Sequence, residues 1–419
     1  MKMGYRQKVG ARSHNEEDVM KRLRVSLVLF LVVVLLASAC GDKDKSPEVR
    51  TVKVAVALPT DFAPTQHMYQ GIQLALEEAG GKAGEVKVEI VPFKTSQGDE
   101  YSVELEAQAA RTAVADKNVV AYIGITTSGQ GREAIPILNE GRLVGISATA
   151  TWPGLTKTGY GAGEPGIYYP TGLRTFFRLT PADDAQGKAG ASWIREMGYQ
   201  KIYIIDDGSP YGTGVAGIFE VAAVDLKLDV IAHDHFDFQT ETPETYAQIA
   251  QRIVDAQPDA VYFGGYATEG GSTLIGALRT LDPDLPFVGS DGIVQHPSII
   301  EENGAELVEG VYATDVAVPP EAIGTESAND FITRYQAKYQ EDPLNLSVMG
   351  YEAMQVVLYA IAQADEPTRA NVLDEISNLG QFNGLLGSWS FDDNGDITSG
   401  LMSGWTIENG QWKFVKVLR

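Results

Sequence analysis

Strand-like and helix-like patterns of apolar residues alternate along residues 51–147. Apolar side chains at every second position of TVKVAVAL predict a strand over residues 51–58. Helical spacing of the next apolar residues predicts a helix over residues 68–79. The alternation continues with strands expected over residues 85–91, 119–125 and 143–147, and helices over residues 101–116 and 129–140. Strands joined by single helices predict a parallel sheet with right-handed crossovers.

The same alternation starts again at Lys201. Strands are expected over residues 201–206, 227–232, 259–265 and 286–290, and helices over residues 212–224, 244–256 and 271–281. Two successive runs of this kind predict two similar α/β lobes. Residues 324–379 are then almost purely helical, and the C-terminal residues return to strand patterns, with a hairpin turn expected at Asn394-Gly395.

An apolar run, Val25–Ala39, follows three basic residues near the N-terminus, Lys21, Arg22 and Arg24. A membrane-spanning helix needs about 20 apolar residues, and this shorter run is typical of the hydrophobic part of a signal peptide. Because residues 1–19 are polar and Met20 directly precedes the basic residues, we expect translation to start at Met20. Residues 1–39 are therefore predicted to form a signal region.

Cys40, the only cysteine of the chain, directly follows the small residues Ala37-Ser38-Ala39. This arrangement resembles a bacterial lipobox, in which the cysteine thiol receives a diacylglycerol thioether. The leucine that usually stands three positions before the cysteine is one position further away, as Leu36. We expect Cys40 to be lipidated and residues 40–50 to form a polar tether to the lipid. An unmodified cysteine in a cleaved signal peptide or a membrane anchor is the alternative.

The mature chain is strongly acidic. Residues 1–39 hold seven of the 33 basic and three of the 56 acidic side chains, which leaves 26 Lys and Arg against 53 Asp and Glu. Such a surface repels nucleic acid and anionic headgroups, so we expect no nucleic-acid partner and membrane contact only through the lipid at Cys40. About 380 mature residues exceed a usual single core and fit two domains.

Signatures of catalysis or of dinucleotide binding are weak. Residues 161–166 (GAGEPG) satisfy G-x-G-x-x-G, but no strand precedes them and Pro165 interrupts the helix that should follow. No phosphate-binding loop, zinc-protease motif or nucleophile elbow occurs in the sequence. We therefore expect no catalytic residues, no cofactor and no enzymatic activity.

Two candidate metal sites are also weak. The segment Asp392-x-Asn394-x-Asp396 hints at a calcium loop, but its glycine is misplaced and no glutamate closes it, so we favour a hairpin turn. The other candidate comprises His233, Asp234, His235 and Asp237. Because no further spaced ligand is apparent, we favour solvated loop histidines there and expect no metal.

Several segments, taken in order, resemble the type 1 periplasmic binding proteins of ABC transporters, specifically the leucine/isoleucine/valine-binding family. The resemblance covers essentially residues 51–415. It is carried by YIGITTSGQ (122–130), GISATATWPGLT (145–156), FFRLTPADDAQG (176–187), DDGSPYGTG (206–214), DAVYFGGYATEGG (259–271), FVGSDGI (287–293) and GSWSFDDNGD (387–396).

This resemblance implies two Rossmann-like lobes joined by a three-crossover hinge, with a ligand buried between them. Residues 51–179 and 316–386 would form lobe 1, and residues 180–315 and 387–419 would form lobe 2. The implied function is that of an extracytoplasmic, lipid-anchored and monomeric solute-binding protein. It would capture a small polar ligand, expected to be an amino acid, and deliver it to an ABC permease in the membrane.

Residues of lobe 1 are expected to hold a ligand carboxylate. Ser128 follows a buried strand and starts a helix, where free N–H groups and the positive end of the helix dipole favour an anion. Thr149 and Thr151 follow the next strand and offer further donors, and Thr127 is an additional lining candidate. The resemblance places the carboxylate of an amino acid at these positions. Plain helix capping and ordinary turn polarity are the alternatives.

Residues of lobe 2 are expected to hold the α-ammonium group. Asp291 lies at the end of a strand, where open α/β sheets bind ligands, and the family commonly has an acidic residue there. Tyr211 and Tyr266 match aromatic positions that cover the ligand, and Trp152 is a further candidate for the side-chain pocket. A turn aspartate and core packing of the aromatic rings are the alternatives.

Two segments depart from the family's pattern. Residues 154–172 form a long loop rich in glycine, tyrosine and proline, and residues 59–66 (PTDFAPTQ) lack the usual glycine-rich start. Both loops are expected to border the cleft, so the preferred side chain of the ligand stays open. Amides, urea and aromatic acids are alternative ligands, and a ligand-sensing receptor domain is an alternative role.

Overall fold

The computed structural model describes Met1, residues 50–98 and residues 100–418. The signal region and Cys40 lie outside the described residues, so expectations about them stay predictions. Arg50–Arg419 form one compact unit that contains two large sheets. Within residues 50–98 and 100–418, no helix has the length and apolar character that a membrane span requires.

The first sheet has six strands in the order β2-β3-β1-β6-β7-β8, and we call this sheet with its helices lobe 1. Only the short β2 pairs antiparallel. The strands are β1 (Thr51–Leu58), β2 (Lys82–Ala83), β3 (Val86–Lys94), β6 (Val119–Ile123), β7 (Val144–Ser147) and β8 (Phe176–Arg178); the helices are α2 (Ala63–Glu78), α3 (Val103–Ala115), α4 (Ser128–Glu140), α11 (Glu326–Tyr339), α12 (Asn345–Gln363) and α13 (Arg369–Ser377). The short strands β4 (Ser96–Gln97) and β5 (Glu100–Tyr101) form a separate hairpin.

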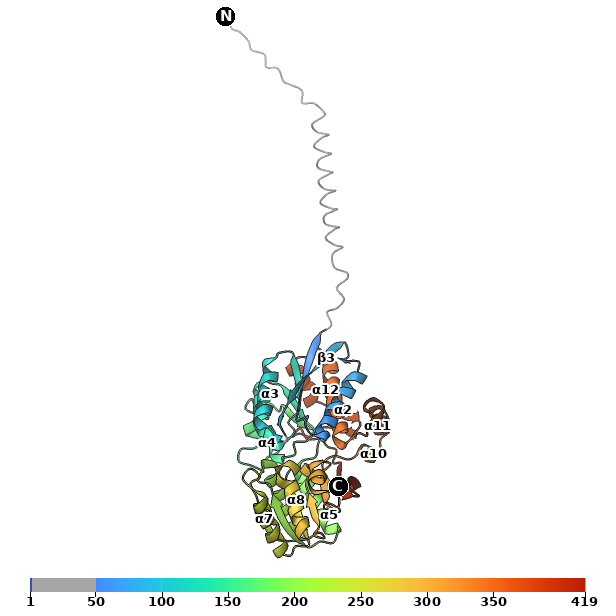
Figure 1. Ribbon diagram of the computed structural model, residues 1–419. Helices are drawn as coiled ribbons and strands as arrows, with labels where there is room; N and C mark the ends of the chain where they lie inside the picture. The colour runs from blue at the N-terminus through green and yellow to red at the C-terminus, as the bar shows by residue number, and fades with distance from the viewer. Residues whose placement is uncertain (2–49, 99, 419) are drawn as a thin grey trace. The chain divides into compact units, whose positions relative to one another are not determined.

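Both faces of β1 are buried, as a parallel strand between two helical layers requires. Val54 and Val56 join the core that contains α2 and α12, whereas Ala55 and Ala57 join the core beneath α3 and α4. Helices α2 and α12 lie side by side (Figure 1). Their close approach depends on Gly350, where an added Cβ would lie 2.1 Å from the carbonyl oxygen of Met68.

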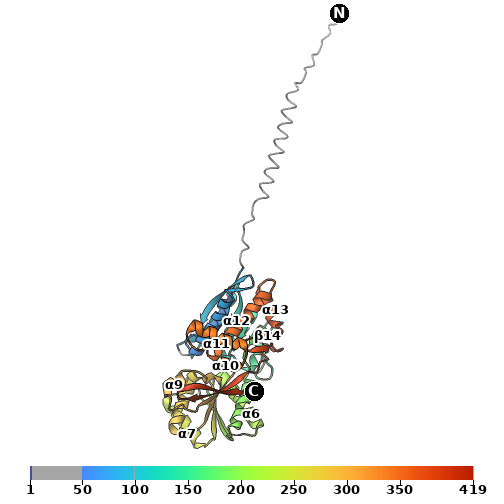
Figure 2. The ribbon, with the colours of Figure 1, turned by 90° about the vertical axis from the view of Figure 1, so that its right-hand side faces the viewer.

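The second sheet has seven strands in the order β10-β9-β11-β12-β13-β16-β17, and with its helices it forms lobe 2. The first five strands pair parallel to one another. Strand β16 pairs antiparallel with β13, and β17 pairs antiparallel with β16. The strands are β9 (Lys201–Asp206), β10 (Asp229–His235), β11 (Ala260–Gly264), β12 (Phe287–Gly289), β13 (Tyr312–Asp315), β16 (Met402–Glu408) and β17 (Gln411–Leu418); the helices are α5 (Asp183–Glu196), α6 (Pro210–Asp225), α7 (Pro243–Asp255), α8 (Ser272–Leu281) and α9 (Ser298–Asn303). The dark red C-terminal strands lie in the same lobe as α6, α7 and α9 (Figure 2).

The chain passes between the two sheets three times. It leaves lobe 1 after β8, returns after β13 through the short helix α10 (Pro320–Ile323), and leaves again before β16. The last passage lies further along the chain than residue 386, where we expected it. Residues 387–397 still belong to lobe 1, because Trp389 and Ile397 are buried in its core. The indole of Trp389, in β15 (Gly387–Trp389), donates to Glu352 of α12 at 2.6 Å; β14 (Phe382–Gly384) pairs with β15.

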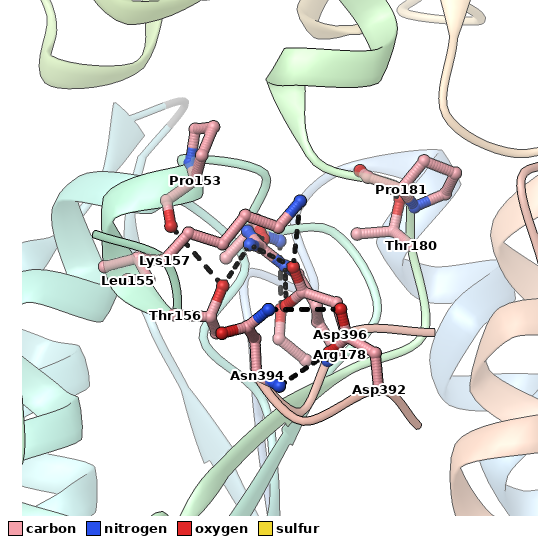
Figure 3. Close-up of polar contacts among 12 residues, drawn as sticks. Pro153, Leu155, Thr156, Lys157, Arg178, Thr180, Pro181, Asp392, Asn394 and Asp396 are labelled. Atoms are coloured by element: carbon pink, nitrogen blue, oxygen red, sulfur yellow. Dashed lines mark hydrogen bonds and ion pairs between the residues drawn. The ribbon is translucent and has the colours of Figure 1, made fainter. Parts of the chain in front are cut away.

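A buried ion-pair network holds the ends of the first and third passages together (Figure 3). Arg178, the last residue of β8, is 0% exposed and binds both carboxylate oxygens of Asp396, at 2.7 and 3.0 Å. Its guanidinium also donates to the carbonyl oxygen of Trp152 at 2.9 Å. Lys157 reaches Asp396 at 3.3 Å and Asp184 of α5 at 3.0 Å, so the network extends from lobe 1 to lobe 2.

Two local expectations change in the structure and one is confirmed. Helix α2 begins at Ala63, five residues before the predicted start, because Pro64 stands in the first turn, where proline needs no N–H partner. Asn394-Gly395 does form a turn, with Gly395 at φ 82 and an antiparallel bridge between Phe391 and Ile397. The loop over residues 154–172 contains the short helical turn η2 (Gly166–Tyr168) and lines a hollow beside α6, away from the cavity described next.

Candidate ligand-binding cleft

A small cavity lies between the lobes, and we call it the inner cavity. Lobe 1 lines it with the start of α2, with β5, with the loops after β6 and β7, and with the start of α12. Lobe 2 lines it with the start of α6 and with the segments after β11 and β12. Its principal side chains are Phe62, Tyr101, Thr126, Thr149, Tyr211, Tyr266, Asp291, His296, Asp315 and Asn345. The strands of both lobes therefore present their carboxyl ends to one space, as open α/β sheets do at ligand sites.

The two lobes touch across the inner cavity. The ring centroids of Tyr101 in lobe 1 and Tyr266 in lobe 2 are 5.2 Å apart. Phe62 in lobe 1 and His296 in lobe 2 make a second ring contact at 5.6 Å. Tyr266 also packs on Tyr211 at 4.7 Å. The structure thus shows a closed arrangement in which aromatic rings separate the inner cavity from a second hollow.

This second hollow, the outer cleft, also lies between the lobes. Thr127 and Gly129 line it from lobe 1, together with the β4–β5 hairpin. Asp237 and Glu269 line it from lobe 2, and the three tyrosines Tyr101, Tyr211 and Tyr266 form its floor. The same tyrosines line the inner cavity, so in this closed arrangement their rings form the wall between the two spaces.

Asp291 is held in place by two hydrogen-bond donors of its own lobe. It opens the short helical turn η4 (Asp291–Ile293) directly after β12. The phenol of Tyr211 and the amide of Gln186 both donate to its Oδ1 atom, the latter at 2.7 Å. Burial raises the pKa of the Asp291 carboxyl above its usual value. A carboxylate fixed in a desolvated cavity is suited to bind a cationic group of a ligand.

The hydroxyls predicted in lobe 1 gather at the start of α4. Thr127 caps this helix: its hydroxyl accepts the backbone N–H of Gln130, and its own backbone N–H donates to the Gln130 side chain. Thr149 donates to the carbonyl oxygen of Thr126 at 2.8 Å, while Ser128 Oγ accepts the backbone N–H of Trp152 at 3.1 Å. The loops after β6 and β7 are therefore tied to each other, with the N-terminal end of α4 between them.

The structure brings most of the predicted residues to the cleft. Thr149, Tyr211, Tyr266 and Asp291 line the inner cavity, and Thr127 lines the outer cleft. Ser128 and Thr151 lie in the adjoining loops, are each 1% exposed, and do not line the inner cavity in this closed arrangement.

Trp152 does not belong to the cleft. Its indole N–H donates to Glu164 at 3.0 Å, and its ring packs on Tyr160 at 5.8 Å. The ring is thereby directed to the hollow beside α6 and away from the inner cavity. We expected Trp152 to line the ligand pocket because it follows Thr151 in the sequence. Its ring is instead oriented by Glu164, which belongs to the loop over residues 154–172.

Several polar residues of the inner cavity escaped prediction, among them Asp315 and Asn345. Asp315 ends β13, and Asn345 begins α12. The Asn345 amide donates to Asp315 Oδ2 at 2.6 Å, and the backbone N–H of Ala317 donates to Oδ1 at 3.2 Å. Burial, and then the nearby Asp291, raise the pKa of Asp315 to about 7. The signal for Asp315 was its place directly after a buried strand, the same signal that identified Asp291.

A third buried acid, Asp183, lies behind the cleft. It is the first residue of α5, and its backbone N–H donates to the carbonyl oxygen of Thr151 at 3.0 Å. Burial, and then Asp291, raise the pKa of Asp183 well above the usual range. Asp183 and Asp315 therefore both lie close enough to Asp291 for its charge to affect their pKa values.

The weak motifs have structural roles. His233 lies in β10 and not in a loop, and it contacts Glu220 at 2.9 Å and Asp206 at 3.2 Å. In the described part of the chain, no group of three or more histidine, cysteine, aspartate or glutamate residues is arranged to hold a metal ion. Residues 161–166 contain a cis bond before Pro165 and lie in the long loop.

Comparisons with known proteins agree with this architecture. The family model described as periplasmic binding protein matches residues 53–410. The leucine-, isoleucine-, valine-, threonine- and alanine-binding protein of Pseudomonas aeruginosa is 26% identical over 366 residues, which are 85% of this chain and 90% of that protein. The crystal structure of a leucine-binding protein, LivK, from Thermotoga maritima superposes with a TM-score of 0.75 at 27% identity, covering 88% of this chain and 99% of that one. A solute-binding protein from R. palustris in complex with benzoate gives a TM-score of 0.69 at 18% identity, covering 88% and 96%.

Proposed function

We propose, because this chain belongs to the periplasmic binding protein family, that it captures an amino acid between its lobes and delivers it to an ABC importer. The observation that carries the proposal is Asp291, a half-buried carboxylate fixed by Tyr211 and Gln186 in an aromatic-walled cavity. The similar proteins from Pseudomonas aeruginosa and Thermotoga maritima are named for binding amino acids, which supports the same ligand class here.

Each charged pole of an amino acid has a partner of its own, a carboxylate in lobe 2 for the ammonium group and hydrogen-bond donors in lobe 1 for the carboxylate. The α-ammonium group binds Asp291, because an unpaired buried carboxylate costs several kcal/mol that a cation recovers. The α-carboxylate binds at the start of α4, where Ser128 and the free N–H groups of the first turn favour an anion. Thr149 and Thr151 supply further donors from the neighbouring loop. Tyr211 and Tyr266 cover the ligand and exclude water.

Closure of the lobes follows from this division of contacts. The carboxylate partners belong to lobe 1 and Asp291 belongs to lobe 2, so the ligand touches both only when the lobes are closed. Binding therefore shifts the equilibrium toward the closed form by its differential affinity. The closed form is what the permease recognises. The protein acts outside the cytoplasm as a monomer anchored by lipid at Cys40, and it binds and releases without a catalytic step.

A thermal-shift screen tests the ligand class. The protein is heated with single amino acids, short amides, urea and aromatic acids, and the true ligand raises the melting temperature by mass action. The expected result is a shift with at least one amino acid and none with benzoate. A shift with aromatic acids or amides alone would contradict the proposal, because neither uses a carboxylate partner for an ammonium group.

A further inference from the structure

We propose that the ligand carries a second cationic group, on its side chain, which binds the Asp315–Asn345 pair of the inner cavity. This inference rests on the proposed function and narrows it to basic amino acids such as lysine, ornithine and arginine. The ligand class would then differ from the leucine, isoleucine, valine, threonine and alanine that the names of the similar proteins give.

The first support is the charge of the cleft lining. Neither the inner cavity nor the outer cleft has a lysine or arginine among the described residues that line it. Both spaces contain acidic side chains, namely Asp291, Asp315, Glu100, Glu104, Asp237 and Glu269. A zwitterion with an aliphatic side chain has no net charge and needs one carboxylate partner. A negatively charged lining attracts and selects a ligand of net positive charge.

The second support is the hydrogen-bonding state of Asn345. Its side-chain N–H donates to Asp315, whereas its Oδ1 atom is buried and has no hydrogen-bond partner among the described residues. Asn345 is 2% exposed and lines the inner cavity. One of its two amide N–H groups is engaged by Asp315, and the pair offers two acceptors to the cavity, the Asn345 oxygen and the Asp315 carboxylate. An ammonium or guanidinium group supplies the donors that such acceptors require.

An aliphatic side chain would leave these acceptors in an unfavourable state. Leucine in the cavity would exclude water from Asp315 and Asn345 without replacing its hydrogen bonds, which costs free energy for each group. Burial, and then repulsion by the nearby Asp291, raise the pKa of Asp315, so placing both carboxylates in a cavity without a cation is unfavourable. Two cationic groups, one for each carboxylate, remove both penalties.

The placement of the two acids suits one extended ligand. Asp291 follows β12 in lobe 2, Asp315 ends the neighbouring strand β13, and Asn345 begins α12 of lobe 1. The α-ammonium at Asp291 and the side-chain cation at the Asp315–Asn345 pair would therefore both contribute to lobe closure.

Lysine and norleucine provide the matched test, because they differ only in the terminal ammonium group. Isothermal titration of the unmodified protein should show lysine, or another basic amino acid, binding about 100-fold or more tightly than norleucine, since a site built for a hydrogen-bonding group rejects the analogue that lacks it. In Asp315→Asn the affinity for the basic amino acid should fall at least tenfold while that for norleucine changes little. Exposed Glu321→Gln serves as the matched charge control and should change neither.

The outcomes separate this inference from the proposed function. Leucine or norleucine binding as tightly as the basic amino acids would overturn the second cationic group and leave amino-acid capture intact. Unchanged lysine binding in Asp315→Asn, with the melting temperature of the free protein retained, would overturn it as well. Failure of every amino acid to bind would overturn both. Cadaverine binding as tightly as lysine would support the cation site and overturn the amino-acid carboxylate.

Discussion

Tyr101 of lobe 1 and Tyr266 of lobe 2 lie with ring centroids 5.2 Å apart and ring planes inclined by 49°. Burial raises the pKa of both phenols, that of Tyr101 and that of Tyr266, above their usual values. Both rings of this contact are therefore shielded from water. The pair closes the inner cavity toward the outer cleft. It therefore stabilises the closed form only, since it joins residues of different lobes.

Removing this ring contact should weaken ligand binding without harming the fold. An aromatic pair contributes about 0.5–1.5 kcal/mol beyond its area, so Tyr101→Ala should lower affinity about threefold to tenfold. The change should appear mainly in the dissociation rate, measured by stopped-flow fluorescence. Tyr359→Ala, at an exposed tyrosine of α12, is the control. Equal affinities in both variants would show that the pair does not contribute to closure.

Ser128 should contribute to ligand binding through the start of α4. We expect Ser128→Ala to weaken amino-acid binding by about 1–3 kcal/mol, the range for a hydrogen bond to a charged group. Its Oγ atom also accepts the N–H of Trp152, so the melting temperature is measured in parallel. Exposed Ser377→Ala is the matched control. Full retention of affinity in Ser128→Ala would place the carboxylate elsewhere.

Asp396 should matter for stability through Arg178. Burial works to raise the pKa of Asp396, but Arg178 and Lys157 hold it below its usual value. Asp396→Ala leaves a fully buried guanidinium without its counter-ion, which costs about 3–5 kcal/mol. Urea denaturation measures the loss. Lys157→Met removes a half-buried partner of the same network and should cost about 1 kcal/mol or less. Similar losses of unfolding free energy in the two variants would contradict the conclusion that the Arg178–Asp396 pair is the most stabilising contact of this network.

Glu106 should make stability depend on pH. It is 0% exposed beneath the start of α4, where it accepts the phenol of Tyr122 at 2.6 Å and the N–H of Ile125 at 3.1 Å. Burial raises its pKa from 4.5 to about 7. Between these values the folded state holds a proton that the unfolded state has released, so the free energy of unfolding falls as pH rises through this window.

Glu106→Gln should remove that contribution. Through this group, the unfolding free energy of the unmodified protein should fall by about 3 kcal/mol between pH 4.5 and 7. The variant should lack this fall. Urea titrations at pH 5 and pH 8 measure it, and Glu104→Gln on the exposed side of the same helix is the control. Parallel pH profiles of Glu106→Gln and the unmodified protein would contradict a raised pKa of the Glu106 carboxyl.

Local patterns predicted most of the regular elements. The bounds expected for β1 and β9 agree with the structure, because β1 has apolar residues at every second position and β9 has the apolar run 202–205 at its centre. The third passage between the lobes was misplaced by about ten residues, because it depends on Trp389 packing against Glu352, a contact that no local pattern contains. Pro64 similarly extended α2 beyond its apolar periodicity.

The candidate site was only partly accessible from sequence. Asp291 and the tyrosines were identified through their family resemblance, and the structure places them around one cavity. Asp315 and Asn345 lie 30 residues apart, and neither belongs to a recognisable motif. Their proximity arises from the return of the chain to lobe 1. Trp152 was misassigned because Glu164, its partner in the long loop, sets its orientation.

The most direct test of the account is isothermal titration of the protein and of Asp291→Ala with the amino acid that raises the melting temperature most. We expect Asp291→Ala to lose at least about 30-fold in affinity, because the ligand's ammonium would lose its buried partner at a cost of about 2–5 kcal/mol. The melting temperature of the free variant should stay close to that of the unmodified protein. Unchanged affinity in the folded variant would contradict amino-acid recognition through Asp291.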